Sequence, residues 1–160
     1  MIPEPHLEAL RHLIERLEKS DTISQARADT MISAHRRQMF ANAFGRALDA
    51  GKLSVSSGEA TDTLPHLQRA DAQEFLKSIQ DDLREQVKIV DRCVTDWFRV
   101  GEYPAPAYPW RITVILRKAK LLDVEREFLT AYCKHFTHTV GASNEKIANR
   151  AMKVGALIRQ

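Results

Sequence analysis

The stretch "DAQEFLKSIQDDLREQVKIVDRCVTDWFR", residues 71–99, carries the most regular apolar pattern in the chain. Its apolar residues recur every three or four positions, which places them on one face of an α-helix with a seven-residue period. One helix over this stretch would be about 40 Å long. That length calls for a long neighbouring helix or a second copy of the chain beside it. The stripe consists of Leu76, Ile79, Leu83, Val87, Val90, Val94 and Trp97.

Two further helices are predicted before this stretch. The first carries one apolar stripe, and the second runs to about Ala50, with Ser20 or Asp21 as its N-cap. The second helix has a clean apolar pattern only in its C-terminal half, whereas its first half surrounds the polar patch "AHRRQ", residues 34–38. This contrast predicts a bend or a partly exposed first half. Residues 52–70 are rich in Ser, Thr and Gly and predict a long loop. The stripe of the first helix is Leu7, Leu10, Ile14 and Leu17, and the clean half of the second holds Phe40, Ala43, Phe44, Ala47 and Leu48.

The C-terminal part predicts a helical hairpin over 109–138 and a last helix over about 143–158. The connector "VGEYPAPAYP", residues 100–109, contains three prolines and a glycine and therefore interrupts the helical pattern. After it, apolar residues resume helical spacing on both sides of the turn at "LLD". The sequence therefore predicts an all-α, single-domain helical bundle of about six helices over 1–160. Its sub-parts are a mildly acidic bundle over 1–100 and a basic hairpin plus last helix over 107–160.

The hairpin resembles a single tetratricopeptide-type unit. Its packing positions in the first helix would be Ile112, Ile115, Leu116 and Ala119, and those in the second helix Phe128 and Tyr132. Leu116 and Phe128 depart from the pattern, because the family prefers small residues at these places. No second copy follows, although such repeats stack in several copies. The resemblance implies a helical scaffold that binds proteins.

Charge is distributed unevenly along the chain. Residues 1–106 contain 14 Lys and Arg against 17 Asp and Glu, whereas residues 107–160 contain 10 against 4. A basic region of this kind predicts an acidic protein partner, a nucleic acid, or contact with the chain's own acidic part. The candidate basic binding face consists of Arg117, Lys118, Lys120, Lys146, Arg150 and Lys153.

Residues with catalytic or metal-binding chemistry do not form a recognisable motif. Cys133, His135 and His138 are close in sequence, but on a helix they point in different directions, whereas zinc needs four converging ligands. Cys93 and Cys133 lie in apolar patterns typical of buried thiols. Phosphate-binding loops and known hydrolase motifs are absent from the sequence. These observations predict a protein that is not an enzyme and has no cofactor or metal.

We therefore expect a non-catalytic protein–protein interaction module, acting as an adaptor, regulator or subunit. It would bind a partner through apolar helix faces, with the basic C-terminal part steering association. The alternative is a nucleic-acid-binding protein that uses the C-terminal basic face, and a small helical enzyme is a third reading. Self-association through the 71–99 helix is left open. The N-terminus lacks the pattern of a signal peptide and no apolar run is long enough to span a membrane, so we expect a cytoplasmic protein without a membrane partner.

Overall fold

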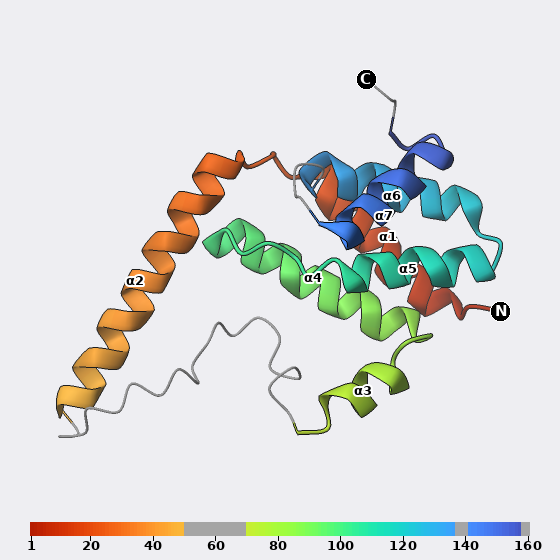
Figure 1. The fold of residues 1–160 in the computed structure, drawn as a ribbon. Helices are drawn as coiled ribbons and strands as arrows, with labels where there is room; N and C mark the ends of the chain where they lie inside the picture. The colour runs from red at the N-terminus through yellow and green to blue at the C-terminus, as the bar shows by residue number, and fades with distance from the viewer. Residues whose placement is uncertain (50–69, 137–140, 158–160) are drawn as a thin grey trace.

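The computed structural model describes residues 1–49, 70–136 and 141–157 of the chain. Every regular element within these ranges is an α-helix, which confirms the all-α fold class, and there are seven helices where the sequence predicted about six. The predicted loop over 52–70 lies almost entirely outside the described residues. The helices are α1 (Glu4–Lys19), α2 (Gln25–Asp49), α3 (Ala72–Ser78), α4 (Leu83–Val100), α5 (Ala107–Lys118), α6 (Leu122–Phe136) and α7 (Ala142–Lys153), as Figure 1 shows.

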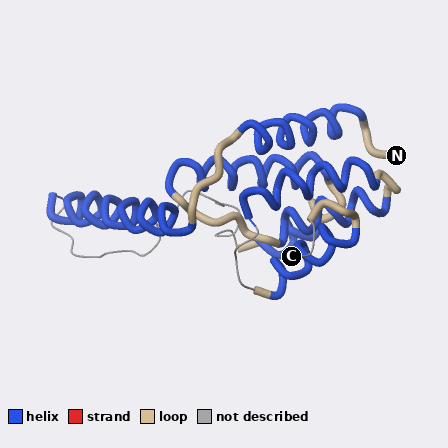
Figure 2. Tube along the Cα trace, turned by 90° about the horizontal axis from the view of Figure 1, so that it is seen from above, coloured by secondary structure: helices blue, strands red, loops and turns tan. Residues whose placement is uncertain are grey.

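Five of the helices, α1 and α4 to α7, pack together as one bundle (Figures 1 and 2). α1 contacts α4 and α6, whereas α5 contacts α4, α6 and α7. The predicted C-terminal hairpin is present as α5 and α6, and its apolar face lies in the core. Each helix contributes one buried stripe, because its apolar residues recur at the helical period. Fully buried side chains of this core include Leu10, Leu17, Val90, Trp97, Ile112, Leu116, Phe128 and Tyr132.

The prediction of one continuous helix over 71–99 is wrong, because the structure divides this stretch into α3 and α4. Asp82 acts as the N-cap of α4, and its Oδ1 accepts the backbone N–H of Glu85 at 3.1 Å. The Gln86 side chain donates from Nε2 to the Ile79 carbonyl at 2.9 Å. An aspartate that satisfies a free N–H competes with helix continuation, and here this local preference outweighs the seven-residue period.

The apolar stripe of α4 is buried within the chain itself. Leu83, Val90, Val94 and Trp97 are each at most 2% exposed, and α4 packs against both α1 and α5. The sequence predicted a long helix or a second copy beside this stretch. In the structure, two shorter helices of the same chain, α1 and α5, pack against α4 instead. The apolar stripe of α4 is therefore not exposed for self-association through the 71–99 stretch.

A close contact after α4 holds the first turn of α2 against the bundle. Gly101 ends α4 with φ +74°, a left-handed conformation that favours glycine. A Cβ at this position would lie 2.3 Å from the carbonyl oxygen of Ala28 in α2. Further along the connector, the Tyr103 hydroxyl donates to the Phe136 carbonyl at 2.9 Å, and its ring meets Trp97 edge-on. The proline-containing connector is thereby held against the bundle, and the start of α2 is held against the connector.

The rest of α2 projects away from the bundle, as both Figure 1 and Figure 2 show. Its N-cap is not Ser20 or Asp21, because the helix begins at Gln25 and the Ser24 hydroxyl accepts the N–H of Arg27 at 3.2 Å. Ala28 is the one buried residue of this helix. The first half of α2 is partly exposed, which is one of the two predicted alternatives. The C-terminal half, with the clean apolar pattern, also exposes its large side chains Phe40, Phe44 and Leu48.

Candidate protein-interaction surface

Within the part of the chain that the structure describes, the predicted basic face divides into residues that have internal partners and residues for which none is found. The last turns of α5 and α7 lie near the start of α6, because α5 leads directly into α6 and Arg150 of α7 contacts Glu125 of α6. The structure therefore brings the two groups of cations to the same end of the bundle. Their individual contacts decide how much of this positive charge is available to a partner.

Arg150 is committed to a buried ion pair. Its guanidinium donates from Nε and Nη2 to the two carboxylate oxygens of Glu125, each at 2.6 Å. The side chain of Glu125 is 1% exposed and that of Arg150 17% exposed. The hydrogen bond to Glu125 raises the pKa of Arg150 above its ordinary value. Because a buried carboxylate needs a partner, Arg150 stabilises the α6–α7 contact rather than offering a free charge to solvent.

Two of the α5 cations also have partners inside the chain. Lys118 Nζ donates to Asp81 Oδ1 at 3.0 Å, and Arg111 Nη2 contacts the same oxygen at 3.1 Å. The hydrogen bond from Lys118 lowers the pKa of Asp81. The guanidinium of Arg117 lies 5.9 Å from the centre of the Trp110 ring, at the distance of a cation–π contact.

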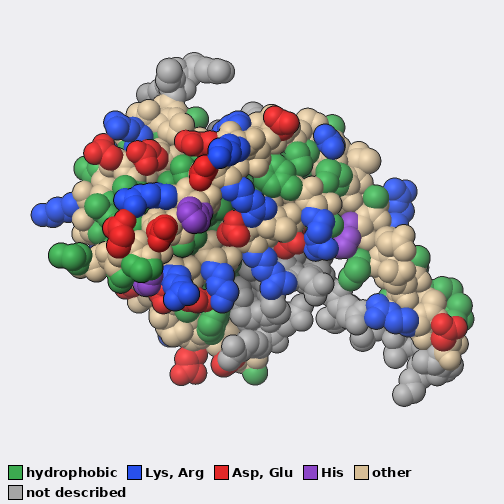
Figure 3. All heavy atoms as spheres, turned by 180° about the vertical axis from the view of Figure 1, so that it is seen from behind, with side chains coloured by type: hydrophobic (Ala, Val, Ile, Leu, Met, Phe, Trp, Pro, Cys, Tyr) green, Lys and Arg blue, Asp and Glu red, His purple; other side chains and the backbone are tan. Residues whose placement is uncertain are grey.

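The three remaining members of the predicted face, Lys120, Lys146 and Lys153, are exposed. None of them forms an ion pair with another residue in the described ranges. Figure 3 shows acidic and basic side chains interspersed over the visible surface of the bundle. Three of the six predicted cations are therefore exposed on a mixed surface, without an ion-pair partner among the described residues.

An exposed apolar stripe lies on α2 instead. Phe40, Phe44 and Leu48 are 61%, 42% and 57% exposed, although they are large apolar side chains. They recur every four residues and so share one face of the helix. The rings of Phe40 and Phe44 stack with their centres 6.3 Å apart. The sequence showed this pattern, but it could not show that the face is turned away from the core.

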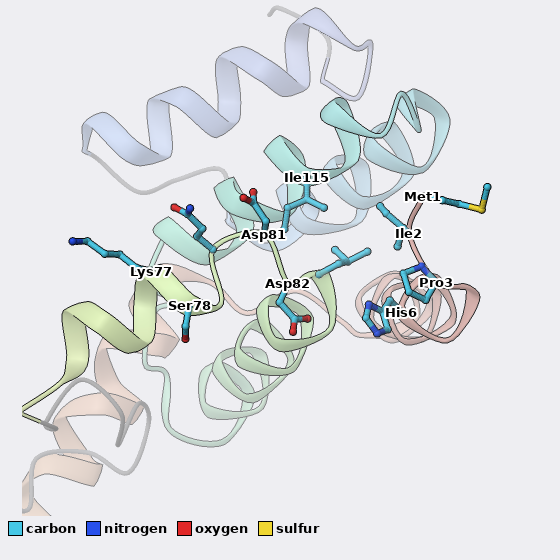
Figure 4. A pocket seen from close by; sticks show the side chains of 11 residues that line it. Met1, Ile2, Pro3, His6, Lys77, Ser78, Asp81, Asp82 and Ile115 are labelled. Atoms are coloured by element: carbon cyan, nitrogen blue, oxygen red, sulfur yellow. The ribbon is translucent and has the colours of Figure 1, made fainter.

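A cleft lies between the start of α1, the turn joining α3 to α4, and α5 (Figure 4). Its volume is about 520 Å³. Figure 4 shows Lys77, Ser78, Asp81 and Asp82 near this turn, opposite the first residues of the chain. The side-chain oxygens of the last three residues have partners within the chain. The Ser78 hydroxyl donates to a backbone carbonyl of α3, Asp81 accepts a hydrogen bond from Lys118, and Asp82 caps α4. His6 lines the opposite side of this cleft, and within the described residues no hydrogen bond joins it to Ser78.

The cysteines and the described histidine of the Cys-His cluster have structural surroundings. Burial raises the pKa of both Cys93 and Cys133 to about 11, so both are thiols at neutral pH. His135 is buried, and its Nε2 donates to the Leu17 carbonyl at 2.7 Å. His138 lies outside the described residues. Among the residues that the structure describes, no group of three or more His, Cys, Asp or Glu is placed to hold a metal ion.

Comparisons with known proteins do not assign the chain to a family. No protein-family model, curated protein or solved structure matches it significantly. The tetratricopeptide-type resemblance of the hairpin therefore stays a prediction. In the described part of the chain, no helix combines the length and the hydropathy needed to cross a membrane.

Proposed function

We propose that the chain is a non-catalytic protein–protein interaction module whose contact element is α2. The observation that carries this proposal is the exposed stripe of Phe40, Phe44 and Leu48 on a helix that projects from the bundle. Apolar anchors at four-residue spacing are what a helix presents when it binds in the groove of another protein. The occupant of this face is a protein with an apolar groove that is long enough for three anchors.

Burial of this stripe would contribute part of the free energy of binding. Full burial of a Phe or Leu side chain contributes about 1.5–3 kcal/mol. Roughly half of each anchor is still exposed, so burying the remainder would contribute about 3 kcal/mol, or about a hundredfold in affinity. The bundle contributes a fixed origin for the helix, because Ala28 is packed against Gly101. An anchored helix loses less entropy on binding than a free peptide of the same sequence would.

The test compares variants of the anchors with a matched control on the same helix. The anchor variant is F40A/F44A/L48A, and the control is Q38A/N42A, whose residues are exposed on the opposite side of α2. Each variant is immobilised and exposed to an extract of the cells that naturally produce the protein, and the proteins it retains are quantified by mass spectrometry. The helix content of each variant is checked by circular dichroism. We expect a partner that is retained at high salt by the wild type and the control but not by the anchor variant. Equal retention by all three proteins would refute the proposal.

Nucleic-acid binding through Lys120, Lys146 and Lys153 is the alternative, and it is supported by the exposure of these lysines. Phosphate contacts of this kind weaken steeply as salt increases. Fluorescence anisotropy of the chain with generic DNA and RNA across a salt series separates the two functions. Binding at low salt that is lost in K146E/K153E but kept in F40A/F44A/L48A would favour the alternative.

A further inference from the structure

We infer that the partner groove has an acidic rim, and that it is recognised by the arginines of α2 rather than by the C-terminal basic region. This inference rests on the proposed function, because it names the chemistry of the partner for the same helix face. It is drawn from two features of the structure: the positive charge beside the anchors of α2, and the internal partners of some of the C-terminal cations.

The exposed part of α2 is both apolar and positively charged. Residues 30–48 contain Arg36, Arg37 and Arg46 and no Asp or Glu. All three arginines are exposed. Arg36 precedes the first anchor, Phe40, by four positions and Arg37 precedes it by three, so both lie one helical turn from it on the same side of the helix. A groove that receives the anchors therefore meets two guanidinium groups at one end.

Guanidinium groups specify what the rim of that groove carries. Arginine recognises carboxylates through paired hydrogen bonds, and neighbouring like charges on the partner would oppose binding. An apolar groove with carboxylates at its edge satisfies both the anchors and the arginines. A basic amphipathic helix bound in an acidic, apolar groove is a known recognition mode.

The C-terminal region is less suited to this role than its composition suggests. Arg150 neutralises the buried Glu125, and Lys118 holds Asp81. These contacts already use positive charge of the basic part to compensate carboxylates of the same chain. Arg36 and Arg37 form no ion pair with another residue in the described ranges, and neither do Lys120, Lys146 and Lys153. Only the two arginines, however, lie one helical turn from the anchor Phe40.

A second copy of the chain is the other occupant that this face could receive. An antiparallel pair of α2 helices that sets Phe40 opposite Phe44 of the other copy brings Arg37 within one residue of Arg46 and Arg36 within one residue of Asp49 of that copy. Charge therefore neither favours nor opposes such a pair, and the experiment below distinguishes the two occupants. The stripe of α4 cannot replace it as a dimer contact, since its residues are buried in the chain's own core.

The experiment places a photo-crosslinking amino acid, p-benzoyl-phenylalanine, at position 48 of the full-length chain in place of Leu48. Crosslinking in an extract of the producing cells is compared in four backgrounds: unchanged, F40A/F44A, R36E/R37E and K146E/K153E. The last two change the net charge of the chain by the same amount, so they differ only in where the charge is reversed. Crosslinked peptides are sequenced by mass spectrometry.

We expect crosslinks to a peptide in which Asp and Glu exceed Lys and Arg. Their yield should fall about tenfold or more in R36E/R37E and stay within about twofold of the unchanged background in K146E/K153E. If F40A/F44A abolishes the crosslink but R36E/R37E does not, the proposed function stands and this inference is overturned. If F40A/F44A leaves the crosslink unchanged, or no protein is crosslinked, both are overturned.

Two further outcomes identify a different occupant and overturn the inference. A crosslink from one copy of the chain to another would show that the stripe is a self-association surface. Co-sedimentation of the chain with vesicles of phosphatidylcholine and phosphatidylserine, lost in F40A/F44A and absent with phosphatidylcholine alone, would show that the acidic surface is a lipid headgroup layer. Circular dichroism of each variant verifies that α2 remains helical.

Discussion

Removing Arg150 should destabilise the protein more than removing any other single cation of the predicted basic face. The variant Arg150→Met leaves the carboxylate of Glu125, which is 1% exposed, without the guanidinium that binds both of its oxygens at 2.6 Å. Breaking a buried ion pair in this way costs about 3 kcal/mol or more. With a urea slope of about 2 kcal/mol per M, the unfolding midpoint should decrease by about 1.5 M.

A double-mutant cycle measures the interaction energy of Glu125 with Arg150 apart from the other contacts of the two side chains. Replacing both partners, as in Glu125→Leu with Arg150→Met, should bring stability back to within about 1 kcal/mol of the wild type, because apolar replacements of buried pairs are often neutral. Lys146→Met is the matched control on the same helix, and since Lys146 is exposed its effect should be below about 0.5 kcal/mol. Urea unfolding at neutral pH, followed by circular dichroism at 25 °C, measures the wild type, both single variants, the double variant and the control.

The reasoning is refuted if Arg150→Met costs less than about 1 kcal/mol at pH 7. It is also refuted if the double variant is as unstable as the single one, because the cost would then be lost packing rather than an unpaired charge.

Gly101→Ala should cost about 3 kcal/mol by urea unfolding, because it combines a positive φ with a backbone carbonyl 2.3 Å from the new Cβ. Gly155→Ala has the same sign of φ but nothing within 4 Å, so a loss of only about 1 kcal/mol is expected and equal losses would contradict the steric cause. Cys93 and Cys133, whose thiol pKa values burial raises to about 11, should not react with Ellman's reagent at pH 7.5 until the protein is unfolded, and fast reaction of the native protein would show that they are accessible. Burial lowers the pKa of His135 below its ordinary 6.5, so the unfolded state takes up a proton first and stability should fall as pH drops below about 6.5. His135→Gln should flatten this part of the stability–pH curve, and an unchanged curve would assign the dependence to other groups.

The elements that could be predicted from the sequence are those decided by local pattern. The hairpin of α5 and α6 forms where apolar residues recur at helical spacing, and Pro104 and Pro106 interrupt the helical pattern before it. The failure over 71–99 has a local cause as well, because Asp82 caps a new helix while Ile79 and Leu83 continue the apolar period across the break. Periodicity reports which residues share a face, and it does not report whether the backbone between them is continuous.

The basic face shows a second limit of sequence reasoning. Arg150 and Glu125 lie on different helices, and their pairing depends on how α6 and α7 cross. Composition counted Arg150 as a free positive charge, since a count of residues contains no information about contacts distant in sequence. The same limit applies to Lys118, whose partner Asp81 follows α3.

The sequence by itself determined that the chain is helical, which residues share each apolar face, and that residues 30–48 are positively charged. Only the tertiary structure decided that the stripe of α4 is buried and the stripe of α2 is exposed, although both have the spacing of a packed helix. The physical reason is that an apolar face is buried only if other helices reach it. α4 lies between α1 and α5, whereas α2 leaves the bundle directly after its contact with Gly101.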